Sequence, residues 1–161
     1  MRAATVAQIK KELKHLPPEE LQALVLRLAR FKKDNKELLT YLLFEAGDEY
    51  SYIESVKSIV DEGFGSINTR STYFAKKSVR KILSGLRKFI RYSGKKETEV
   101  ELLIHFCEKM NTMQPPIIRS QVLMNLNDRL VAKIRSTILK LDEDLRYDYS
   151  VELKSRLDEE L

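Results

Sequence analysis

Lysine and arginine are concentrated in one stretch of the chain, residues 69–96. This stretch holds ten of them and no Asp or Glu, whereas the flanking segments 1–68 and 97–161 each carry a net negative charge. The net charge of the whole chain is +5, so the positive excess arises from this stretch. Guanidinium and ammonium groups bind carboxylates and phosphates, so the chemistry that the pattern favours is recognition of a polyanion.

The spacing of these residues predicts that most of them share one face of a helix. At about 100° per residue, the apolar residues between them fall on the opposite face, which we expect to be buried. Ser or Thr at 69–72 can cap the start of the helix, and Ser93-Gly94 can end it. Seven cations form the predicted basic strip: Lys76, Lys77, Arg80, Lys81, Arg87, Lys88 and Arg91.

Three interpretations of the basic strip stay open. It pairs with acids of the same chain, such as Asp61 and Glu62 or Glu97, Glu99 and Glu101; or it binds the phosphates of DNA or RNA; or it lies on an anionic membrane surface. The membrane interpretation is the weakest, because the apolar face lacks Trp and is needed for the core.

No other residues form a pattern typical of catalysis or metal binding. His105 and Cys107 are two apart in a predicted helix and therefore point to different faces, and His15 stands alone at a helix end. The acidic runs 142–144 and 158–160 resemble helix ends, and Gly63-Phe64-Gly65-Ser66 resembles a helix stop and lacks the Lys of a phosphate loop. We expect no enzyme activity, no metal and no cofactor.

Composition predicts an all-α protein. Of 161 residues 43% are hydrophobic, which is enough for a core, and five Gly and four Pro are too few for the many turns of an all-β fold. The single cysteine forms no internal disulfide. No apolar run is long enough for a transmembrane helix, and the N-terminus lacks the apolar core of a signal peptide, so we expect a cytoplasmic protein.

Breaks and apolar periodicity predict about seven to eight antiparallel helices, arranged as a bundle or as a short helical-repeat superhelix. The second helix, which begins at Pro18, has an apolar stripe that we expect to be buried: Leu21, Leu24, Val25, Leu28 and Phe31. Residues 50–62 and 147–159 share six identities at thirteen positions. We expect one domain, 1–161, in which the basic helix 69–96 joins two halves, 1–68 and 97–161.

Four helical segments carry a resemblance to a known family: Ser51–Lys57, Ala75–Lys81, Ile90–Ser93 and Glu101–Cys107. With the opening Glu12–Leu21, they resemble an uncharacterised family of small bacterial all-helical proteins. The resemblance implies an all-α fold over most of the chain. It brings no activity, substrate or site residue.

Together these features predict a non-catalytic protein–protein interaction module whose basic strip receives an acidic partner. The alternative is a nucleic-acid-binding accessory protein that grips phosphates through the basic helix, residues 70–96. The position of the strip separates these functions from a purely structural role: a strip covered by acids of the same chain is structural, and an open, concave one is a binding site.

Overall fold

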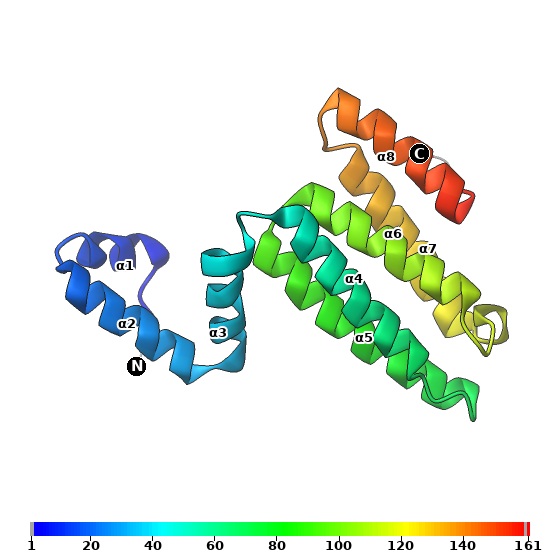
Figure 1. Ribbon diagram of the computed structural model, residues 1–161, viewed down its shortest axis with the longest axis horizontal. Helices are drawn as coiled ribbons and strands as arrows, with labels where there is room; N and C mark the ends of the chain where they lie inside the picture. The colour runs from blue at the N-terminus through cyan, green and yellow to red at the C-terminus, as the bar shows by residue number, and fades with distance from the viewer. Residues whose placement is uncertain (1, 160) are drawn as a thin grey trace. The chain divides into compact units, whose positions relative to one another are not determined.

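The computed structural model describes residues 2–159 and 161, and within these residues every regular element is helical (Figure 1). The predicted all-α class is confirmed. The chain divides into two compact units, Met1–Phe44 and Glu45–Leu161. The division therefore falls between residues 44 and 45, and not at the ends of the basic segment, which lies inside the second unit. Among the described residues, no helix has the length and apolar character needed to cross a bilayer.

The first unit contains α1 (Val6–Leu13), α2 (Pro18–Phe31) and α3 (Lys33–Thr40), followed by a π-helical turn over Tyr41–Glu45. Thr5 caps α1 through a reciprocal pair of hydrogen bonds with Gln8: the amide of each residue donates to the side chain of the other. Pro18 opens α2, with two acids in the first turn near the positive end of the helix dipole.

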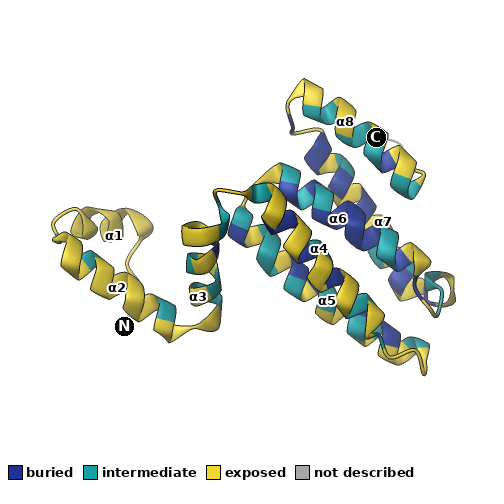
Figure 2. Ribbon diagram, viewed as in Figure 1, coloured by how far each residue is buried: buried dark blue, intermediate teal, exposed yellow. Residues whose placement is uncertain are grey.

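The apolar stripe of α2 is not buried as the sequence predicts. Leu24, Val25, Leu28 and Phe31 are exposed, and Leu21 is half-buried. Among the described residues of this unit, Tyr41 alone is buried, and α1 and α2 are almost entirely exposed in Figure 2. The physical reason is size: α2 packs mainly against the short helix α3, and two short helices have too little surface to enclose each other's side chains.

The second unit is built around α6. It contains α4 (Glu49–Gly65), α5 (Thr72–Ser93), α6 (Lys96–Thr112), a 3₁₀ turn (Ile117–Arg119), α7 (Gln121–Ile138) and α8 (Glu143–Leu157). α6 packs against α4, α5, α7 and α8 and buries six consecutive residues, 102–107. α4 and α8, which carry the two similar segments, both contact α6; their duplication stays a prediction.

The basic segment forms the predicted amphipathic helix α5. Ser71 caps its first turn by accepting a hydrogen bond from the amide of Phe74, and Gly94 ends it with a φ of 68°. The apolar face of α5 is buried in the core of the second unit through Ala75, Val79, Leu83, Leu86 and Tyr92.

A glycine sets the distance between α4 and α5. α4 ends at Gly65, inside the predicted helix stop, but Gly63 lies within the last turn and faces α5. A Cβ at position 63 would lie 2.9 Å from Cγ1 of Ile82, so a larger residue there would force the Ile82 side chain or its helix to shift.

Candidate functional site

A groove of about 810 Å³ lies among α5, α6 and α7 in the second unit. α5 contributes Arg80, Arg87, Lys88 and Arg91, which recur on one side of the helix because 7, 8 and 11 residues are close to whole numbers of turns. Four residues of the predicted strip therefore line one concave surface.

α7 supplies two further cations, Arg129 and Lys133, which lie one turn apart. Sequence reasoning missed both. The signal was weak, because Asp128 directly precedes Arg129 and the two cations are not part of a basic run. They join the α5 cations only because α5 and α7 both pack on α6.

The floor of the groove is apolar. Leu83 from α5, Leu103 from α6 and Leu130 from α7 are buried there, and Leu126 is half-buried. A ligand in this groove would therefore meet leucine side chains at its base and cations along its sides.

The groove carries a large excess of positive charge. Glu99 is the single acid among the described residues that line it. Its carboxylate lies 3.3 Å from Nζ of Lys133 and accepts a hydrogen bond of 3.3 Å from the Thr137 hydroxyl. Arg80, Arg87 and Arg91 are exposed and form no ion pair within the described part of the chain.

The other three members of the predicted strip lie outside the groove. Lys81 lines a smaller hollow of about 370 Å³ that also includes Gly63 and Gly85. Nζ of Lys76 lies 5.8 Å from the centre of the Tyr73 ring, at cation–π distance, and Lys77 is exposed. The strip is therefore not one continuous site.

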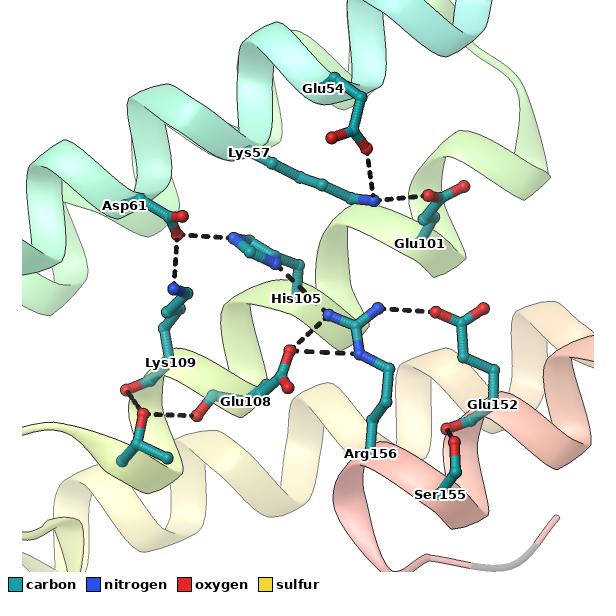
Figure 3. A network of polar contacts seen from close by, with 11 residues as sticks. Glu54, Lys57, Asp61, Glu101, His105, Glu108, Lys109, Glu152, Ser155 and Arg156 are labelled. Atoms are coloured by element: carbon teal, nitrogen blue, oxygen red, sulfur yellow. Dashed lines mark hydrogen bonds and ion pairs between the residues drawn. The ribbon is translucent and has the colours of Figure 1, made fainter.

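Two of the acids expected to neutralise the strip, Asp61 and Glu101, are engaged elsewhere. The Asp61 carboxylate contacts Nε2 of His105 at 2.7 Å and Nζ of Lys109 at 3.1 Å, and the Glu101 carboxylate contacts Nζ of Lys57 at 2.6 Å (Figure 3). Within the basic segment, Lys95 does have an acidic partner, Glu49, at 2.8 Å. The groove arginines of α5 thus lack the internal compensation that the first interpretation requires.

These acids belong to a polar network that joins α4, α6 and α8 (Figure 3). Nε of Arg156, on α8, donates to the Glu108 carboxylate at 3.1 Å, and a second guanidinium nitrogen donates to the Glu152 carboxylate at 2.6 Å. The guanidinium also lies 3.3 Å from Nδ1 of His105. Because that nitrogen faces a donor, we assign the proton to Nε2, which then donates to Asp61. His105 is thus held between an acid and a guanidinium, with both ring nitrogens occupied.

The network also shifts the ionisation of Asp61. Burial acts to raise the pKa of this carboxyl, but hydrogen bonds from His105 and Lys109 and the positive charge of Lys109 outweigh it, so the pKa is lowered. Burial raises the pKa of the nearby Cys107 thiol to about 12, which keeps it protonated near neutral pH. No group of three His, Cys, Asp or Glu side chains in the described residues is placed to hold a metal ion.

Comparisons with known proteins add no relative: no family model, curated protein or solved structure matches the chain. The groove must therefore be interpreted from its own geometry.

Proposed function

We propose that this protein is a non-catalytic interaction module that captures an acidic, leucine-containing segment of a partner protein in the groove among α5, α6 and α7. The observation that carries the proposal is the combination of six cations and one acid around a leucine floor. An amphipathic acidic segment matches both features, because its apolar side chains cover the floor while its carboxylates meet the rims.

Nucleic acid fits this groove less well. Single strands are usually held by aromatic side chains that stack on bases, and none of the described residues that line the groove is aromatic. The aromatic residue next to the strip, Tyr73, lies beside Lys76, which does not line the groove. Phosphate binding by the arginines alone is the alternative that the experiment must separate.

The test uses the full chain and a fluorescent synthetic peptide that, as a helix, carries Leu along one face and Glu along the opposite face. Anisotropy titrations should show binding that weakens with salt. Reversing the charge at Arg87, Arg91 and Arg129 together should weaken it by about 30-fold or more, since close opposite charges become like charges. The matched control, Lys76→Glu with Lys77→Glu, alters the same helix outside the groove and should change affinity by about twofold or less.

Two further probes identify the ligand class. A peptide with the same charge but Ser in place of Leu should bind about tenfold more weakly, because it leaves the floor uncovered. A DNA or RNA duplex of equal charge should bind more weakly than the Leu–Glu peptide. Tighter duplex binding, with a slope of log affinity against log salt of about −4 to −5, would replace the proposal with the nucleic-acid function. Equal binding of the Leu and Ser peptides would also contradict it.

A further inference from the structure

The first unit presents an apolar surface that the structure leaves uncovered. On α2 the side chains of Leu24, Leu28 and Phe31 are 40%, 59% and 75% exposed. They recur at three- and four-residue spacing, so they form one stripe along the helix. An exposed apolar stripe along a helix is typical of a surface that binds another molecule, so we expect an occupant that fits it.

The charges beside the stripe indicate which occupant fits. Glu20 and Arg27 are seven residues apart, which is close to two turns, and both line one shallow hollow with Ala23 and Leu24. They therefore border the same edge of the stripe, the acid towards the start of α2 and the cation towards its end. Neither forms an ion pair with another described residue.

A second α2 placed antiparallel on the stripe satisfies these charges. If the two helices cross between Ala23 and Leu24, Glu20 of each copy lies level with Arg27 of the other. In an antiparallel helix pair the same edges of both helices face each other, and two-fold symmetry forms the pair of charges twice. A parallel pair in the same register would instead place Glu20 level with Glu20 and Arg27 level with Arg27.

We infer that the chain self-associates as a symmetric dimer through antiparallel contact of the α2 helices, with Leu24, Leu28 and Phe31 at the interface and Glu20 paired with Arg27 of the second copy. The interface is separate from the basic groove and does not depend on the function proposed for it.

Sedimentation equilibrium of the full chain tests the dimer. The wild type should associate reversibly with increasing concentration, and Leu28→Asp should weaken association by at least 100-fold, because it places a charge in an apolar interface. Leu139→Asp is the matched control: Leu139 has nearly the same exposure, 56%, but lies in the second unit, and the change should leave association unaltered. A monomer at all concentrations, or a dimer that persists in Leu28→Asp, would overturn the inference.

Charge exchange tests the antiparallel geometry. Glu20→Arg or Arg27→Glu alone should weaken the dimer about tenfold, since each creates two like-charge contacts, and the double exchange should restore wild-type affinity. Glu19→Arg and Arg30→Glu change the same helix on the side away from the stripe and should have little effect. Circular dichroism confirms that each variant keeps its helical content. Failure of the double exchange to restore association would rule out the antiparallel pairing.

Discussion

α2 and α5 have the same kind of sequence but different surroundings. Both are amphipathic, with an apolar stripe along one side. The stripe of α5 lies against α4 and α6 and includes fully buried side chains, whereas that of α2 is largely exposed. The difference shows that amphipathicity predicts that a helix has a face to bury, and does not say what buries it. In the second unit α6 supplies that surface, and the described residues of the first unit form no equivalent helix.

The largest contrast between the units should appear in thiol reactivity. Cys107 is fully buried, and burial raises its pKa to about 12, so it should react with a disulfide reagent at pH 8 only when the second unit opens. Position 6 on α1 is 82% exposed. We expect Val6→Cys to add a second thiol that reacts at least 1,000-fold faster than Cys107.

Absorbance of the released thiol measures both phases in one sample. In urea sufficient to unfold the chain the two thiols should react at similar rates, which is the control for intrinsic reactivity. Fast reaction of Cys107 in the native wild type would show that the second unit is not the more stable one.

Matched phenylalanine substitutions should give the next largest contrast. Phe106 on α6 is fully buried and packs edge to face on Phe64, with 5.2 Å between the ring centroids. Phe106→Ala should therefore lower the free energy of unfolding by about 3–5 kcal/mol. Phe31→Ala removes the same atoms from a site that is 75% exposed and should change it by about 0.5 kcal/mol or less in dilute solution. Urea unfolding followed by circular dichroism measures both, and equal losses would contradict the contrast in burial.

Removing an ion pair should also lower the free energy of unfolding more in the second unit than in the first. Arg156 joins α8 to α6 through Glu108, with Glu152 beside it, and hydrogen bonds to charged groups contribute more than neutral ones. Arg156→Met should lower the free energy of unfolding by about 1.5–3 kcal/mol. In the first unit Lys33 forms an ion pair with Glu37 through a largely exposed side chain, and Lys33→Met should have an effect of about 0.5 kcal/mol or less.

Thermal unfolding checks this pair of substitutions. Arg119→Met is a control within the second unit, because Arg119 is exposed and forms no ion pair with the described residues. If Arg119→Met were as damaging as Arg156→Met, the network would not explain the loss.

Local chemistry in the sequence was sufficient to place most helices. Pro18 was identified at a helix start, the cap Ser71 was among the candidates at 69–72, and Ser93-Gly94 was identified as the end of α5. These signals work because caps and breaks act over a few residues. The boundary between the two units was not found, since it depends on which surfaces meet, and the charge distribution pointed to other boundaries.

Only part of the candidate site could be predicted, because periodicity acts within one helix and the rest of the site depends on packing between helices. Periodicity gathered Arg80, Arg87 and Arg91 on one face of α5, but it also included Lys76, which lies outside the groove. Arg129 became part of the site through packing of α7 on α6, and no local pattern records that packing. The central role of α6 had a readable signal, the continuous apolar run around His105, which is typical of a helix buried on several sides.

The smallest expected contrast concerns acid. The pKa of Asp61 is lower in the folded chain than in the unfolded one, so its ionised carboxylate stabilises the second unit above an ordinary pKa near 4, and this contribution is lost as the pH falls through the folded-state value. Between about pH 5 and pH 3 the wild type should lose stability faster than Asp61→Asn, by about 1 kcal/mol or less, because the side chain is 44% exposed. Urea unfolding at several pH values measures the difference. The difference between wild type and Asp61→Asn should be smaller in a His105→Gln background, since Nε2 of His105 lies 2.7 Å from the Asp61 carboxylate. Parallel pH profiles of wild type and Asp61→Asn would show that the ionisation of Asp61 is not linked to folding.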